Sequence, residues 1–178
     1  PATSQVTRRR KRLSDVVLVE TVGIGQSELD IRYLADHVYL VLQPLGGDEI
    51  QFLKAGIIEI PDSFILNKCD DPAANQSYYQ LRSSLSLARP FDEELPPIFR
   101  TSARTGEGVD ALAASMLTVQ RRHTDDEREE YFFTRWVEDE WGATGRRYAE
   151  GRDLLADGFD AAQGAFGPGI VEWLTKGG

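Results

Sequence analysis

Apolar residues in the first two thirds of the chain form short unbroken runs that alternate with stretches of helical spacing. The runs predict strands at residues 15–20, 37–42, 62–67 and 98–101. Runs without alternating polar positions are typical of strands buried on both faces of a helix-covered sheet. The helical spacing predicts helices at 28–36, 48–60 and 75–89, and from Val109 onward. This alternation predicts an α/β fold, with a mostly parallel sheet flanked by helices.

From residue 121 the pattern becomes entirely helical. A first helix is predicted from its aligned apolar positions, which are Phe132, Phe133, Trp136, Val137 and Trp141. A second helix is predicted from Arg146 to about Ala162, and the cluster Gly167-Pro168-Gly169 is interpreted as its end. We therefore divide the chain into a sheet-bearing part, 1–120, and a C-terminal helical extension, 121–178.

Composition narrows the classes of function. The net charge of −9 over 178 residues argues against a nucleic-acid partner, because phosphate neutralisation needs an excess of Lys and Arg. No apolar run is long enough to cross a membrane. The single cysteine, Cys69, rules out an internal disulfide and favours a reducing, cytoplasmic location.

The end of the first predicted strand carries Glu20 and Gly23. Ligands of parallel sheets bind at the carboxyl ends of the strands, so both residues fall where a ligand is expected. The Glu20 carboxylate could hold a hydrated Mg²⁺, and Gly23 lets the backbone approach a terminal phosphate. The alternative is an ordinary buried strand that ends in a glycine turn.

Two further motifs follow the third and fourth predicted strands. Asn67-Lys68-Cys69-Asp70 ends one strand and Ser102-Ala103 ends the next. The Asp70 carboxylate suits guanine, whose N1–H and exocyclic amine are both donors, whereas adenine lacks that pair. The Lys68 stem could cover the base, Asn67 could tie neighbouring loops, and the Ala103 N–H could meet the guanine O6. As an isolated tetrapeptide, residues 67–70 would more often be a polar turn, but the order of motifs predicts GTP or GDP binding.

Three segments, residues 20–28, 47–56 and 67–70, together resemble the MeaB/ArgK family, the GTPases associated with methylmalonyl-CoA mutase. The resemblance runs from about Asp15 to Leu117. It implies a P-loop GTPase fold, of which residues 1–120 are the C-terminal part of the G domain. It also places residues 23–28 in a switch and Gln51 and Lys54 toward the nucleotide or a client protein. These two could instead be a solvent-facing pair on an amphipathic helix.

The resemblance also implies a physiological role. Family members are chaperones that use GTP binding and hydrolysis to gate cobalamin delivery to an acyl-CoA mutase and to protect that enzyme. The expected partners are thus a cobalamin-dependent mutase and, through the C-terminal helices, a second copy of the chain. Those helices could equally pack on the G domain.

A phosphate-binding loop of the form G-x-x-x-x-G-K-[ST] is missing, since no lysine of the chain follows a glycine. The family carries this loop upstream of the strand at 15–20, so we expect this polypeptide to begin after it. We expect such a fragment to bind GTP poorly and not to hydrolyse it. We also expect its first strands to expose apolar surface or an unpaired edge, with poor solubility as the consequence.

Three alternative functions remain open. A nickel-delivery maturation GTPase shares the loop order, but it needs soft or imidazole ligands, and only His37, His123 and Cys69 are available. A non-hydrolysing interaction module could keep a degenerate G-domain shell. A kinase acting on a transport protein is the third, although no phosphoacceptor site is recognisable.

Overall fold

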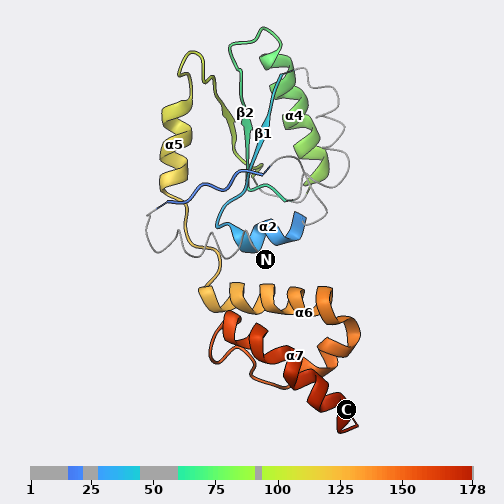
Figure 1. The fold of residues 1–178 in the computed structure, drawn as a ribbon. Coiled ribbons are helices and arrows are strands. Elements are labelled where there is room, and N and C mark those ends of the chain that lie inside the picture. The colour runs from blue at the N-terminus through green and yellow to red at the C-terminus, as the bar shows by residue number, and fades with distance from the viewer. Residues whose placement is uncertain (1–15, 22–27, 45–59, 91–93, 178) are drawn as a thin grey trace. The chain divides into compact units, whose positions relative to one another are not determined.

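The computed structural model describes residues 16–21, 28–44, 60–90 and 94–177, which fall into two compact units, Val16–Arg122 and 123–177. The first unit contains a three-stranded parallel sheet flanked by helices (Figure 1). Its strands, in spatial order, are β1 (Tyr39–Leu42), β2 (Ser63–Leu66) and β3 (Ile98–Arg100). Its helices are α2 (Glu28–Leu34), α4 (Ala74–Ala88) and α5 (Val109–Leu117). The predicted α/β fold with a parallel sheet is confirmed.

The core of this unit lies between the sheet and α4. All four residues of β2 are buried, as expected for a strand covered on both faces. The buried cluster comprises Leu42, Phe64, Leu66, Leu81 and Leu85. Ala88, which follows Leu85 by three residues on the same helix, is exposed. The other face of the sheet meets α5, where the Tyr39 hydroxyl lies 3.1 Å from Ser115 Oγ.

The strand predicted at 15–20 is wrong for the described residues of that segment. Residues 16–21 form no strand, and Leu18 is 75% exposed. A strand is stable only when its backbone pairs with a neighbour, and β1 is an edge of the described sheet. Val41 on β1 is 57% exposed, which agrees with the expected exposure of apolar surface. The helix predicted at 48–60 lies almost entirely outside the described residues.

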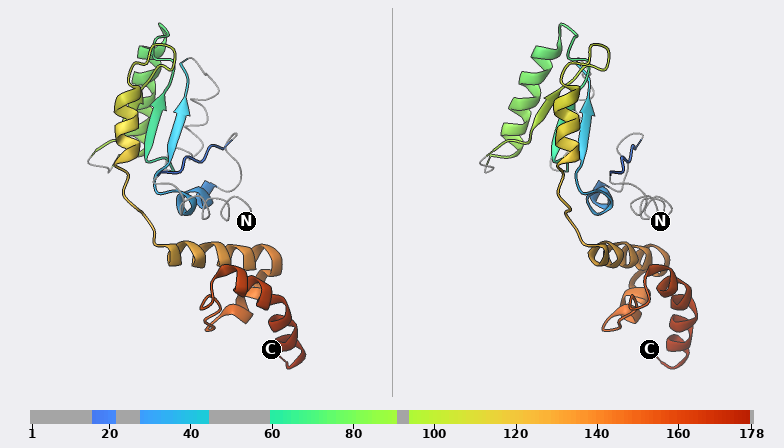
Figure 2. Two further views of the ribbon diagram at one scale, coloured as in Figure 1. Left: turned by 60° about the vertical axis from the view of Figure 1, so that its left-hand side comes forward. Right: turned by 90° about the vertical axis from the view of Figure 1, so that its left-hand side faces the viewer.

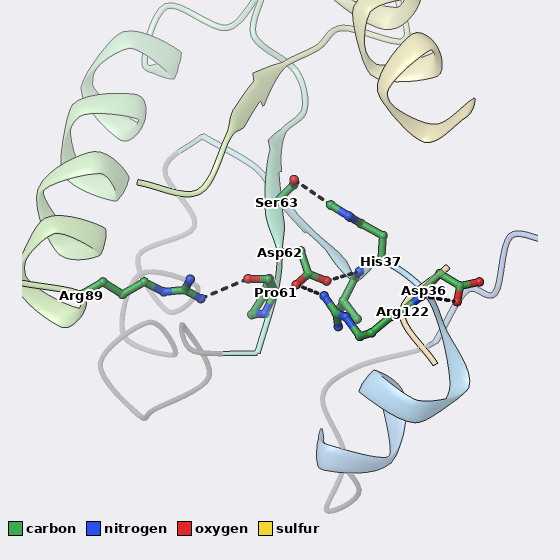
Figure 3. Close-up of polar contacts among 8 residues, drawn as sticks. Asp36, His37, Pro61, Asp62, Ser63, Arg89 and Arg122 are labelled. Atoms are coloured by element: carbon green, nitrogen blue, oxygen red, sulfur yellow. Dashed lines mark hydrogen bonds and ion pairs between the residues drawn. The ribbon is translucent and has the colours of Figure 1, made fainter. Parts of the chain in front are cut away.

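At the starts of the strands, Asp62 and Arg122 join the chain that leaves α5 to the sheet (Figure 3). The Asp62 carboxylate forms an ion pair with Arg122 and accepts the Val38 N–H at 2.8 Å. The Arg122 N–H donates to Asp36 Oδ1 at 3.1 Å. Two further contacts close this end of the sheet: His37 Nε2 with Ser63 Oγ at 2.9 Å, and Arg89 with the Pro61 carbonyl at 3.1 Å.

The second unit consists of α6 (Asp125–Ala149) and α7 (Phe159–Thr175). Thr124 and Glu127 form a capping box that satisfies free N–H groups at the start of α6. Gly142 interrupts the helical backbone of α6, with φ 55° and ψ −143°. The buried core consists of Phe133, Val137, Phe159, Ala162, Phe166 and Ile170. Within the described parts of the chain, no helix has both the length and the apolar character that a bilayer span requires.

The helix predicted from Arg146 to about Ala162 is wrong at both ends. Residue 146 still belongs to α6, and α7 continues through Gly167-Pro168-Gly169. Phe166 and Ile170, one turn apart, are fully buried, and each such burial contributes about 1.5–3 kcal/mol. This offsets the roughly 3 kcal/mol that a proline costs inside a helix. A Cβ at Gly169 would lie 2.1 Å from the Tyr148 hydroxyl, so this glycine permits close packing and does not end the helix.

Candidate functional site

The loops that follow β2 and β3 meet at one end of the sheet, at the top of Figure 1. The Asn67 N–H donates to the Leu42 carbonyl at 2.9 Å, which ties this loop to β1. The Cys69 N–H donates to the Thr101 carbonyl, also at 2.9 Å, which ties the same loop to the chain beyond β3. The backbone thereby holds the Asn67–Asp70 motif beside the Ser102–Ala103 motif, as the strand order predicts.

Asp70 is held by side chains of the second loop. Ser102 Oγ donates to Asp70 Oδ1 at 2.5 Å and itself accepts the Thr105 N–H at 3.2 Å. Ser102 is fully buried, so its hydroxyl is a fixed donor. Arg104, from the same loop, forms an ion pair with Asp70 Oδ2.

These contacts keep Asp70 ionised. The Ser102 hydrogen bond is the main cause that lowers the pKa of Asp70, and it outweighs partial burial, which acts in the opposite direction. The backbone N–H of Asp70 and the charge of Arg104 lower the pKa further. An ionised carboxylate only accepts hydrogen bonds, so this loop presents an acceptor to any ligand.

Asn67 and Lys68 connect the motif to its neighbours. Asn67 Oδ1 accepts from the Thr101 hydroxyl at 3.4 Å, and Lys68 Nζ donates to Gln43 Oε1 at 2.5 Å. Lys68 has φ 57°, a left-handed conformation that few residues other than glycine adopt. Gln43 directly follows β1, so the ends of all three described strands contribute to this region.

Gly108 shapes the loop after β3. It has φ +71°, and a Cβ there would lie 1.9 Å from the Arg100 carbonyl oxygen. The Ser102 N–H donates to the Glu107 carbonyl at 2.9 Å, and the Gly106 N–H donates back to the Ser102 carbonyl at 2.8 Å. These bonds curl the loop so that Ser102 is buried while the adjacent Ala103 is exposed.

Cys69 is buried, and burial is the main cause that raises the pKa of its thiol, followed by the nearby charge of Glu107. A neutral thiol is a poor metal ligand, because metals bind the thiolate. His37 lies at the opposite end of the sheet, hydrogen-bonded to Ser63. No group of three or more His, Cys, Asp or Glu residues suited to a metal ion occurs among the described residues.

The structure brings together Asn67, Lys68, Asp70, Ser102 and Ala103. Glu20 is exposed, and the views of Figures 1 and 2 place segment 16–21 nearer the starts of the strands than the loops beyond their ends. Because this segment pairs with no strand of the described sheet, the sheet does not fix its position. The remaining predicted site residues, Gly23, Gln51 and Lys54, lie outside the described residues.

Arg104 and Gln43 were not singled out from the sequence. Gln43 directly follows a predicted strand, and parallel strands end at a common edge, so its position could have indicated it. Arg104 lies only two residues after Ser102. Its pairing with Asp70 depends on how the loop curls, which the sequence pattern does not reveal.

Comparisons with known proteins show which family and which proteins the chain is similar to. The family described as "Methylmalonyl Co-A mutase-associated GTPase MeaB" matches residues 13–137. A Pyrococcus horikoshii protein named "Putative GTPase" is 46% identical over 101 residues, 55% of this chain and 32% of the relative. The mouse "Methylmalonic aciduria type A homolog, mitochondrial" is 38% identical over 112 residues, 61% of this chain and 27% of the relative. "GTPase ArgK" of Escherichia coli is 36% identical over 102 residues, 55% of this chain and 31% of the relative.

The chain therefore spans about a third or less of the length of these relatives. The family match covers well over half of the chain, from before β1 into α6, and includes both loops of the site. It confirms the resemblance noted in segments 20–28, 47–56 and 67–70. The chain belongs to the MeaB family of methylmalonyl-CoA mutase-associated GTPases.

Proposed function

We propose that this chain supplies the guanine-recognising part of a protein that binds GTP and GDP and hydrolyses GTP. The observation that carries the proposal is the ionised Asp70 carboxylate, which follows β2 and is held by buried Ser102 from the loop after β3. A fixed pair of carboxylate oxygens matches the N1–H and exocyclic amine of guanine. Adenine would leave the carboxylate unpaired, so the same contact provides selectivity.

The other residues of the site receive supporting roles in this proposal. The Lys68 stem covers one face of the base. The link from Asn67 to Thr101 keeps the two loops at a fixed separation. The exposed Ala103 offers its backbone N–H to the guanine O6.

The test is Asp70→Asn in the full-length protein. Asparagine offers a donor amide to xanthine, whose C2 carbonyl replaces the guanine amine. We expect the ratio of GDP to XDP affinity to fall by at least about 100-fold, consistent with the selectivity of sites built around buried hydrogen bonds. Equilibrium binding of labelled GDP and XDP measures it. An unchanged base preference would remove Asp70 from the site.

At the phosphate end we propose that Glu20 steadies Mg²⁺ through water and that Gly23 contacts the γ-phosphate. Nucleotide-bound Mg²⁺ needs only one or two protein carboxylates, because phosphates and water supply its other ligands. An exposed Glu20 meets that requirement once segment 16–21 extends along the sheet, so that residue 20 reaches the ends of the strands. The ion would neutralise phosphate charge. Loss of the γ-phosphate would then release the switch at 23–28, with Gln51 and Lys54 facing the nucleotide or the client.

Residues 1–178 alone, which contain no Gly-Lys pair, should bind GTP weakly and not hydrolyse it. The amides, lysine and hydroxyl of a phosphate-binding loop provide most of the contacts to the phosphates. Phosphate release by the purified 178-residue chain measures this. Sustained GTP hydrolysis that is lost when Asp70 is replaced would show that this chain does not need a phosphate-binding loop for hydrolysis.

The physiological role we propose is that of a chaperone for a cobalamin-dependent acyl-CoA mutase, gating cofactor loading and protecting the enzyme. Family membership supports a link to a mutase. Co-purification of the full-length protein with a cobalamin enzyme, sensitive to the bound nucleotide, tests it. Nucleotide binding without any such association would leave the GTPase proposal standing and reject the chaperone role.

We further propose that residues 1–120 are the C-terminal part of a G domain and that the helical extension, 121–178, forms a homodimer. Two large apolar side chains on α7, Val171 and Leu174, are exposed. Their burial against a second copy would exclude apolar surface from water. Sedimentation of Val171→Asp, compared with Thr175→Asp at the end of the same helix, tests this. A wild-type monomer would reject it.

A further inference from the structure

The ion pair between Arg104 and Asp70 uses the acceptor that the proposed base contact requires. Asp70 Oδ1 accepts from Ser102, and Asp70 Oδ2 is paired with Arg104. Both partners of Asp70 belong to one loop, the turn that follows β3. They differ in accessibility, because Ser102 is fully buried whereas the Arg104 side chain is 78% exposed.

The guanidinium group and the edge of guanine offer the same chemistry to a carboxylate. Guanidinium presents parallel N–H donors in one plane, and it prefers carboxylate oxygens as partners. Guanine presents N1–H and an amine N–H, also parallel and in one plane. Ser102 approaches from the buried side of the carboxylate and leaves the outward side for either of these partners.

We propose that Arg104 competes with the guanine base for the Asp70 carboxylate, so that nucleotide binding is an exchange of one planar donor group for another. This inference rests on the proposed guanine site. Arg104 thereby sets the affinity of the site without contributing a contact to the nucleotide. Arg104 also balances the negative charge of Asp70 on its outward side when no base contacts the carboxylate.

The exchange requires that Arg104 leave at small cost while Asp70 stays in position. An exposed ion pair is weak, since water solvates the separated charges and salt screens them. The Ser102 hydrogen bond stays in place during the exchange, because it is formed on the buried side. Asp70 itself is only 20% exposed, so its orientation does not depend on Arg104 alone.

The experiment compares Arg104→Gln with Arg82→Gln in the full-length protein, by equilibrium binding of labelled GDP at low and high salt. Arg82 is a matched control, because it is exposed on α4 and its guanidinium group donates to the Tyr78 hydroxyl and not to Asp70. We expect Arg104→Gln to bind GDP about two- to fivefold tighter than wild type, the range that one exposed ion pair supplies. The difference should shrink at high salt.

A second pair of variants tests whether the effect passes through Asp70. In the Asp70→Asn background with XDP as the probe, Arg104→Gln should add no gain, because the ion pair is already gone. Weaker GDP binding by Arg104→Gln would show that Arg104 contacts the nucleotide, and an affinity equal to that of Arg82→Gln would show no competition. Either result overturns this inference while leaving the guanine site intact. Absence of GDP binding by the wild type would overturn the proposed function as well.

Discussion

Two aspartate–arginine pairs lie at opposite ends of the same short sheet, and they differ in what surrounds them. Asp62 and Arg122 join the starts of the strands, with side chains 15% and 28% exposed (Figure 3). Asp70 and Arg104 lie beyond the ends of the strands, with side chains 20% and 78% exposed. The two carboxylates are similarly enclosed, so the difference lies in the arginines.

The two pairs also differ in their remaining contacts. Asp62 also accepts the Val38 N–H, and Arg122 also donates its backbone N–H to Asp36, so this pair is part of the backbone framework. Asp70 depends instead on the hydroxyl of Ser102. An ion pair anchored to backbone is structural, whereas one whose arginine projects into solvent can exchange partners. The same two residue types therefore occur in two different settings, one tied to backbone and one open to solvent.

The largest expected effect concerns the backbone of the site. Gly108→Ala should destabilise the sheet-bearing unit by about 2–4 kcal/mol, because the new Cβ would meet the Arg100 carbonyl and the positive φ is strained. Gly106→Ala is the matched control, since its φ is +82° and nothing lies within 4 Å of the added Cβ. Urea unfolding of both variants measures the difference. Equal losses of unfolding free energy in the two variants would show that backbone strain, and not the contact with Arg100, causes the destabilisation.

The next effect concerns the structural pair. Asp62→Ala should cost about 1–3 kcal/mol of unfolding free energy, because it strips a partner from both the Val38 N–H and the Arg122 guanidinium. Asp70→Ala should cost less, since Arg104 is already solvated and only the Ser102 hydroxyl loses an enclosed partner. Thermal unfolding of the two variants under identical conditions compares them. A larger loss of stability in Asp70→Ala than in Asp62→Ala would show that the pair of Asp70 and Arg104, and not the pair of Asp62 and Arg122, is the structural one.

A smaller effect concerns the ionisation of Asp70. Ser102→Ala should raise the pKa of Asp70 toward its ordinary value of 3.8, because the hydrogen bond from Ser102 is the main cause of the lowered pKa. With the folded pKa below the unfolded one, this contribution to stability is complete above about pH 4 and is lost as the pH falls through the folded pKa. Carboxyl NMR titration of both proteins measures the shift. An unchanged pKa would assign the lowering to Arg104.

The smallest effect concerns His37, beside the structural pair. Burial is the main cause that lowers the pKa of His37 below 6.5; Asp62 opposes it, and Arg122 adds to it. Because the unfolded chain takes up the proton first, stability should decline as the pH falls from 6.5 toward the folded pKa. Asp62→Asn should lower the His37 pKa further. Imidazole NMR titration measures the His37 pKa in both proteins. A wild-type pKa above 6.5 would show that burial is not the dominant cause, and a higher pKa in Asp62→Asn than in the wild type would show that the Asp62 charge does not raise it.

Much of the fold followed from pattern alone. The unbroken runs at 37–42, 62–67 and 98–101 became the three strands, since uninterrupted apolar runs bury both faces of a strand wherever a sheet forms. The positions of Asp70 and Ser102 followed too, because parallel strands end at one edge. The run at 15–20 has the same character but forms no strand among the described residues. Pairing, which depends on a neighbouring strand, decided that outcome.

Local chemistry along the chain was enough to determine the residue types of the site, the parallel order of the strands and membership of the MeaB family, because these depend on spacing and side-chain type. Only the tertiary structure decided that Arg104 pairs with Asp70, that Arg122 joins the starts of the strands and that α7 passes through Gly167-Pro168-Gly169. Each of these depends on contacts between segments distant in the chain or on the curl of a loop. The energy of such contacts outweighs local preference, and a pattern of nearby residues does not encode it.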